Sequence, residues 1–313
     1  MADIFLKTLP FFLLIGTGYA AAATRFFSDQ ATAALTKFVF YFALSAMLFR
    51  FSANLSFGEV FDPRFIGVYL AATAFIYVIA TAAALRRRIP IAEAAVEAQC
   101  AVIGNSGFLG IPMLALLMGQ AAVGLIMMML AVDLLVFGSL IVILITGSRD
   151  KQLSLGVFGT VGKGLVSNPM LMSIFLGFAW SALGWPIPEP ANEFLAILGA
   201  AATPGALFAI GASLANKSAE RMRVAVWLAF GKLVLHPGAV AIAALLIWPL
   251  EPFAAAVMIA TAALPTAGNI FILAQHYGVA PQRVSATILI STAASVVTVS
   301  LVLAWLAERV AFQ

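Results

Sequence analysis

Two hydrophobic stretches of this sequence are interrupted at mid-span by residues of the same kinds. The first interruption covers residues 104–112 (GNSGFLGIP) and the second covers residues 263–269 (ALPTAGN). Proline and glycine at bilayer depth leave main-chain groups that lipid cannot satisfy, so they are tolerated where the backbone is buried or lines a polar cavity. Paired interruptions in matching positions of two halves indicate the binding site of a membrane carrier.

The chemistry expected at a crossing of these interruptions is ion binding. Four half-helix ends would converge, of which the N-terminal ends suit an anion and the unwound carbonyl groups suit a cation or a hydrogen-bond donor. Asn105 and Asn269 each add a donor and an acceptor. The alternative is two kinked structural helices whose asparagines satisfy neighbouring backbone. The binding hypothesis assigns the site to Asn105, Ser106, Gly107, Pro112, Pro265, Thr266 and Asn269.

Proline chemistry predicts where the first segment unwinds. Pro112 has no amide hydrogen, so carbonyl groups about one turn earlier lose their helical partner and the helix is expected to unwind near Gly107. Pro265 and Gly268 are expected to interrupt the second segment in the same way.

Three ionisable side chains inside predicted spans are candidates for coupling or charge balance. Asp133 lies near the middle of its span and could carry a proton or sodium ion, or could be a permanently paired structural aspartate. Lys232 and His236 lie one helical turn apart, and either could meet an anionic substrate or pair with Asp133. Simple charge balance by Lys232 and a structural hydrogen bond of His236 beside Pro237 are the alternatives.

The elements that must position these residues are transmembrane helices. Of the 313 residues 63% are apolar and 10% are charged, against about 25% charged in soluble domains. The single cysteine, Cys100, offers neither a disulfide nor a metal cluster. Runs of about 20 apolar residues can span a bilayer as helices, and ten are predicted, at residues 3–24, 31–50, 64–85, 93–118, 121–147, 164–183, 191–214, 222–248, 252–276 and 282–310.

The distribution of basic residues predicts the orientation. The sides of the membrane are distinguished by an excess of lysine and arginine in cytoplasmic loops. The turns that follow odd-numbered spans hold Arg25, Arg86, Arg87, Arg88, Arg149, Lys151, Lys163, Lys217, Arg221, Arg223 and Arg283. The opposite side holds only Lys7, Arg50, Arg64 and Arg309. We therefore expect both termini outside a cytoplasmic (inner) membrane, and Glu93 and Glu97 near the start of the fourth span are assigned to the helix dipole.

Five spans precede and five follow the longest polar connection. An odd number of spans per half means that any structural similarity between the halves is an inverted repeat. The matching features are Pro10 and Pro169 near the two starts, residues 42–49 against residues 203–210 in the second span of each half, and the broken fourth and ninth spans. The prediction is an all-α integral membrane protein of ten transmembrane helices, with a first repeat at 1–150, a cytoplasmic connector at 151–163 and a second repeat at 164–313.

Three motifs together resemble the auxin efflux carrier family, in the bacterial branch that includes malonate and malate permeases. They are residues 105–112 (NSGFLGIP), 232–237 (KLVLHP) and 264–269 (LPTAGN). The resemblance implies a scaffold of the first, second, sixth and seventh helices beside a mobile domain. It also places the crossing prolines at Pro112 and Pro265 and a substrate carboxylate near Asn105. Leu44-Ser45 departs from the Leu-Pro pair of many relatives.

The expected function is secondary-active transport of a small organic anion, a mono- or dicarboxylate or an auxin-like aromatic acid, by alternating access. No cofactor or metal is expected, and coupling to H⁺ or Na⁺ is open. The partners expected are the anion and the lipid bilayer, not nucleic acid, and a homodimer is left open. An ATP-driven pump is disfavoured because no Walker A pattern occurs. An enzyme is not expected, and a channel or sensor on a transporter scaffold is the alternative.

Overall fold

The computed structural model describes residues 2–55, 62–150, 155–215 and 222–309. Within these ranges the regular structure is helical, and extended pairing is limited to one isolated bridge between Gly104 and Thr266. Six of the described helices are long and apolar enough to cross a membrane, or seven if one bent pair counts as a single span. The predicted all-α membrane architecture is therefore confirmed at this level.

Helices of the first half follow the predicted apolar runs, and π-helical turns (η) interrupt several of them. In order they are α1 (Ala2–Ala23), α2 (Asp29–Phe38), η1 (Val39–Ala43), α3 (Leu44–Ala53), α5 (Pro63–Arg86), α6 (Ile91–Val102), η2 (Ser106–Gly110), α7 (Ile111–Met118), α8 (Ala121–Val132), η3 (Asp133–Phe137) and α9 (Gly138–Asp150).

Helices of the second half are built in the same way. In order they are α10 (Leu155–Val166), α11 (Pro169–Ala182), α12 (Glu189–Ala200), α13 (Ala202–Ala215), α14 (Met222–Phe230), η4 (Gly231–Leu235), α15 (His236–Ile242), η5 (Ala243–Ile247), α16 (Pro252–Ala262), α17 (Asn269–Tyr277) and α18 (Pro281–Ala307). Inserted π-turns occur mostly as single turns and frequently near functional sites.

Polar caps and prolines set where several helices begin. Asp62 accepts hydrogen bonds from the first amides of α5, and Pro63 then occupies the first turn. Asn168 and Pro169 do the same for α11. A capping side chain satisfies amides that have no partner within the helix, and proline fits there because its missing N–H is not needed.

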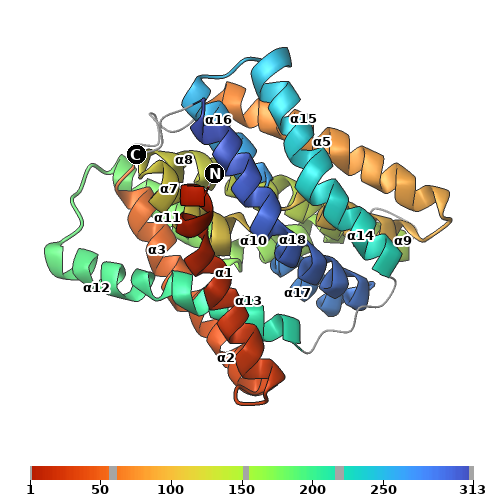
Figure 1. Ribbon diagram of the computed structural model, residues 1–313, viewed down its shortest axis with the longest axis horizontal. Helices are drawn as coiled ribbons and strands as arrows, with labels where there is room; N and C mark the ends of the chain where they lie inside the picture. Colours follow the sequence, from red (N-terminus) through yellow and green to blue (C-terminus); the bar gives the residue numbers. More distant parts are fainter. Residues whose placement is uncertain (1, 56–61, 151–154, 216–221, 310–313) are drawn as a thin grey trace.

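The helices pack as two bundles (Figure 1). The first bundle consists of α1, α2, α3, α11, α12 and α13, and the second contains α5–α9 and α14–α18. In the first bundle α1 crosses α13 very closely, because a Cβ on Gly18 would lie 2.0 Å from the Phe208 carbonyl oxygen and one on Gly211 would lie 1.8 Å from that of Ile15. Small residues allow such approaches between membrane helices.

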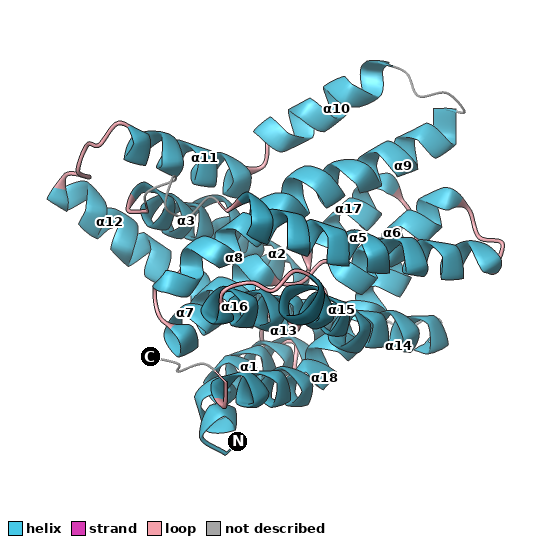
Figure 2. Ribbon diagram, turned by 90° about the horizontal axis from the view of Figure 1, so that it is seen from above, coloured by secondary structure: helices cyan, strands magenta, loops and turns pink. Residues whose placement is uncertain are grey.

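The sixth predicted span is bent. Gly159–Val166 of α10 and Pro169–Ala182 of α11 meet at 69°. Helix α10 begins at Leu155, inside the region predicted as a connector, and residues 151–154 lie outside the described ranges. Figure 2 shows α10 beside the end of α9 and away from the centre of the molecule.

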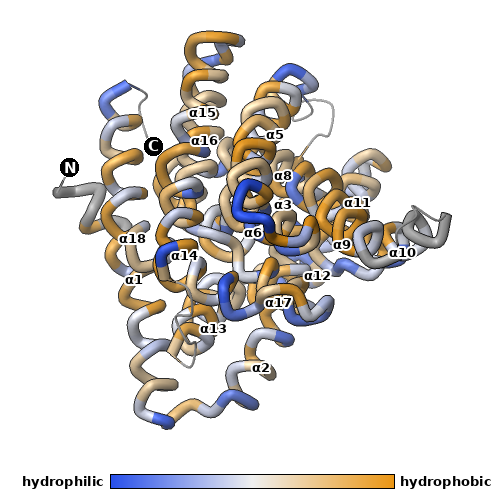
Figure 3. Tube along the Cα trace, turned by 90° about the vertical axis from the view of Figure 1, so that its right-hand side faces the viewer, coloured by the Kyte–Doolittle hydropathy of each residue, from blue (hydrophilic) through white to orange (hydrophobic). Residues whose placement is uncertain are grey.

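A buried ion cluster corrects the assignment of Glu93 and Glu97 to the helix dipole. Glu97 is 1% exposed and pairs with both Arg87 and Arg283, and Arg283 also contacts Glu93 at 3.0 Å. The cluster joins the start of α18 to α6 and to the turn before it, which is the hydrophilic turn next to α6 in Figure 3. The sequence suggested only a local role for the carboxylates because Arg283, which joins both of them, lies more than 180 positions away along the chain.

Candidate functional site

The two interrupted segments meet in an antiparallel main-chain contact. The Asn105 amide donates to the Pro265 carbonyl at 2.8 Å, and the Ala267 amide donates to the Ile103 carbonyl at 3.0 Å. These two bonds flank the bridge between Gly104 and Thr266. Each segment therefore satisfies one amide and one carbonyl group of the other, as the bilayer interior requires.

The first interruption lies earlier in the chain than the proline predicted. Helix α6 ends at Val102, and the residues without helical structure are Ile103 to Asn105. The region near Gly107, expected to unwind, is wound as the π-helical turn η2, and Pro112 occupies the first turn of α7. The prediction of unwinding near Gly107 is wrong, because pairing with the second segment, and not the missing amide of Pro112, determines where the helix opens.

The C-terminal ends of α6 and α16 are neutralised by hydrogen bonds from the protein itself. The Thr266 hydroxyl donates to the Cys100 carbonyl of α6 at 3.0 Å. The Lys232 ammonium donates to the Ala262 carbonyl, the last residue of α16. Lys232 is fully buried, and a Cβ on Gly104 would lie only 3.3 Å from its Nζ. The negative ends of both helix dipoles thus already have donors.

The N-terminal ends of the two continuing helices border a cavity of about 340 Å³. Asn105 and Gly107 at the start of η2, and Gly268 and Asn269 at the start of α17, line it. The first amides of a helix have no partner within the helix and carry partial positive charge. Among the described lining residues there is no lysine or arginine. The positive field at the cavity surface therefore comes from helix ends, with the Lys232 ammonium behind Gly104 as a further positive charge.

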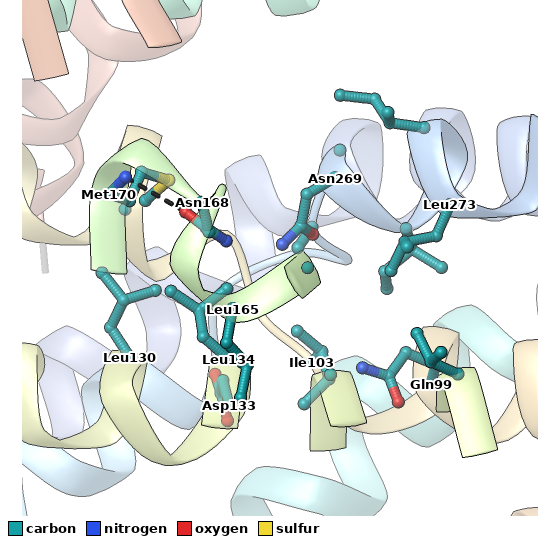
Figure 4. A pocket seen from close by; sticks show the side chains of 18 of the residues that line it. Gln99, Ile103, Leu130, Asp133, Leu134, Leu165, Asn168, Met170, Asn269 and Leu273 are labelled. Atoms are coloured by element: carbon teal, nitrogen blue, oxygen red, sulfur yellow. Dashed lines mark hydrogen bonds between the residues drawn. The ribbon is translucent and has the colours of Figure 1, made fainter. Parts of the chain in front are cut away.

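Three buried oxygen atoms in the cavity wall have no hydrogen-bond partner within the described residues. They are Oε1 of Gln99, Oδ2 of Asp133 and Oδ1 of Asn269. Figure 4 shows these side chains around the cavity, with Met170 of α11 and Asn168, which caps that helix, on another side. Buried polar atoms normally have a partner, so this wall is built for water or a ligand. Either amide, turned by 180°, would present two N–H donors.

Asp133 begins a chain of polar contacts that runs behind the cavity. The Tyr69 hydroxyl donates to its Oδ1 at 2.6 Å. One turn further along α5, Thr73 Oγ1 lies 3.0 Å from Nε2 of His236, whose Nδ1 lies 3.3 Å from Lys232 Nζ. An ammonium only donates, so Nδ1 accepts and Nε2–H is left to donate to Thr73. No ion pair within 4.0 Å joins Asp133 to Lys232 among the described side chains.

The predicted site residues fall into two groups. Asn105, Gly107, Asn269 and Asp133 line the cavity. The others lie outside its wall, and several of them hold the crossing together: Ser106, Pro112, Pro265, Thr266, Lys232 and His236. The sequence analysis missed Gln99 and Asn168, two uncharged polar residues that line the cavity. The available signal was an amide inside a predicted apolar span, which does not show which way the side chain points.

Comparisons with known proteins identify the family. A family model described as membrane transport protein matches residues 3–156 and 149–303. The chain belongs to the membrane transport protein family, which is the auxin efflux carrier family. Within it, a protein of Rhizobium meliloti (strain 1021) named "Putative malonate transporter" is 32% identical over 303 residues, which cover 96% of this chain and 95% of that protein. Membership makes this chain a multi-pass membrane transport protein.

Proposed function

We propose that this protein is a secondary carrier of a small organic anion, a mono- or dicarboxylate, with its binding site at the crossing of the interrupted segments. One observation carries the proposal: the protein caps the C-terminal ends of α6 and α16, whereas the N-terminal ends of η2 and α17 border the cavity. Helix N-termini bind carboxylates through their free amides and positive dipole ends. The site is therefore biased towards an anion.

The proposed architecture is ten helices in two inverted five-helix repeats. Two contacts of the first bundle support it, because α1 packs on α13 and α11 packs on α3. In the proposed numbering, α1 is the first span and α13 belongs to the seventh, and α11 is the sixth span and α3 belongs to the second. The first and second spans of one half correspond to the sixth and seventh of the other, so each contact joins the first span of one half to the second span of the other half. The contacts of α5 with α6 and of α15 with α16 are related in the same way.

Alternating access is proposed to arise from movement of the second bundle against the first. The cavity supports this because both bundles line it: Phe40 and Met170 come from the first bundle, and Gln99, Asp133 and Asn269 from the second. A relative displacement would carry the crossing and its ligand past the first bundle. We place the protein in the cytoplasmic membrane with both termini outside, on the distribution of basic residues.

A dicarboxylate such as malonate is the proposed substrate class, and the name of the relative supports it. A second carboxylate in this cavity would lie near Asp133, whose Oδ2 has no partner. Two ionised carboxylates at short distance repel each other. We therefore propose that Asp133 takes up a cation, H⁺ or Na⁺, when the anion binds, and that the chain through Tyr69 transmits this change towards Lys232.

Counterflow in proteoliposomes tests the proposed function. Vesicles containing purified protein and unlabelled malonate should accumulate external radiolabelled malonate transiently, and the initial rate should saturate. Asn105→Ala should lower this rate while the folded protein remains in the membrane. A current that grows linearly with malonate concentration and shows no counterflow would favour the alternative function, a channel. Saturable counterflow that Asn105→Ala leaves unchanged would remove the crossing from the mechanism.

A further inference from the structure

A second cavity, of about 430 Å³, lies next to α7. The first bundle lines it with Met47 and Arg50 of α3, Gly199 of α12 and Thr203 at the start of α13. The second bundle contributes Pro112 and neighbouring residues of α7, and Gln120 just before α8. Like the cavity at the crossing, it is therefore formed between the two bundles.

The two cavities lie on either side of one short stretch of chain. Gly107 lines the first cavity and Pro112 lines the second, and Leu109 and Ile111 between them are fully buried. Arg50 and Arg64 mark the side of the second cavity as the outer one in the proposed orientation.

Arg50 supplies the only lysine or arginine side chain among the described residues that line either cavity. Its Nε donates to Oδ1 of Asn192 at 2.9 Å, which fixes the side chain against α12. No described carboxylate lies within 4.0 Å of the guanidinium group. Its two terminal nitrogens have the fork geometry that binds a carboxylate through two parallel hydrogen bonds.

We propose that Arg50 and Gln120 form an outer carboxylate-binding site, distinct from the crossing, which small carboxylates occupy on their way to or from it. The inference rests on the proposed function and adds a second site to it. In the outer cavity one fixed cation attracts the anion. At the crossing, where no cationic side chain lines the wall, helix ends and amides bind it, so the anion can leave the crossing without breaking a salt bridge.

Kinetics with charge-matched variants test the role of Arg50. Arg50→Gln should raise the KM for malonate by about tenfold, the loss expected for one hydrogen bond between charged groups. Arg50→Lys should recover part of that loss, because the charge remains and the fork geometry does not. Arg64→Gln is the matched control, since Arg64 is exposed on the same side, donates to the Pro249 carbonyl at 2.8 Å and does not line the outer cavity.

Chemical modification distinguishes a binding charge from a structural one. The native Cys100 is fully buried, so a cysteine introduced at position 50 is the accessible thiol among described residues. A cationic methanethiosulfonate reagent on Arg50→Cys should restore uptake. An uncharged reagent of similar size should not, and a sulfonate-bearing one should inhibit further. Equal restoration by the cationic and uncharged reagents would overturn the proposal.

Protection of a neighbouring position reports binding without transport. Gln120 is exposed, and Gln120→Cys should be labelled more slowly by the uncharged reagent when malonate is added. Arg50→Gln should abolish that protection. Wild-type uptake with an unchanged KM in Arg50→Gln would refute the outer site and leave the proposed function standing. If the protection depends on Arg50 but the protein shows no counterflow, the outer site stands and the proposed function is refuted.

Discussion

Replacing Asn269 by alanine should weaken anion binding far more than it weakens folding. Oδ1 of Asn269 is buried in the cavity wall without a described partner, so the substitution breaks no hydrogen bond of that atom within the protein. If the amide is turned so that its nitrogen donates to the bound carboxylate, about 1.5–3 kcal/mol is lost, and the Kd rises roughly 10- to 150-fold. Asn269 is the first residue of α17, where alanine is compatible with helix formation.

The assay is equilibrium binding of radiolabelled malonate to purified protein, alongside the unfolding temperature without ligand. Asn269→Asp keeps the shape but adds a negative charge, and should abolish binding at the crossing. The control is Gln30→Ala, since Gln30 is exposed at the start of α2 and lines neither cavity. The reasoning is refuted if Asn269→Ala, folded as the wild type, binds malonate with a Kd within about twofold of it, a difference well under 1 kcal/mol.

Three further predictions concern coupling, the crossing and the first bundle. Asp133→Asn retains an acceptor for the Tyr69 hydroxyl but does not ionise. Transport should therefore lose its response to an imposed pH or sodium gradient, while counterflow persists. An unchanged response to the gradient would make Asp133 structural. Thr266→Val leaves the buried Cys100 carbonyl without its donor and should lower the free energy of unfolding by about 1–3 kcal/mol. Thr266→Ser keeps the hydroxyl and should not lower it. Equal denaturant midpoints for wild type and Thr266→Val would contradict the capping of α6 by Thr266. Gly211→Ala places a Cβ against the Ile15 carbonyl and should lower the free energy of unfolding by about 1–3 kcal/mol. Gly238→Ala is the control and should be tolerated, because a Cβ there would meet nothing within 4 Å. Equal unfolding temperatures of the two variants would refute the close contact between α1 and α13.

Hydropathy and proline positions predicted the helices better than the contacts between them. Apolar runs of bilayer length located the helical segments, because in lipid each segment must satisfy its own backbone. The opening of the fourth segment lies at residues 103–105 and not near Gly107, because the Asn105 amide finds its partner on Pro265, 160 positions away along the chain. A local rule about proline has no access to such a partner.

Side-chain roles that depend on distant residues were the least predictable part of the site. Lys232 caps α16 through the Ala262 carbonyl instead of lining the cavity, and Glu97 pairs with Arg283, 186 positions away along the chain. Asn105 and Asn269 could be found because they lie inside the interruptions themselves. Gln99 could not, because a single amide in an apolar helix does not reveal which way it points.

The location of bound anion tests the central claim most directly. Crystals of the protein soaked with bromomalonate, a dicarboxylate carrying one anomalous scatterer, would locate the ligand without reference to any side chain. We predict a bromine peak in the cavity beside Asn105 and Asn269, with carboxylate density at the starts of η2 and α17. A fully occupied bromine peak elsewhere in the protein, with the crossing cavity holding only water, would contradict the account.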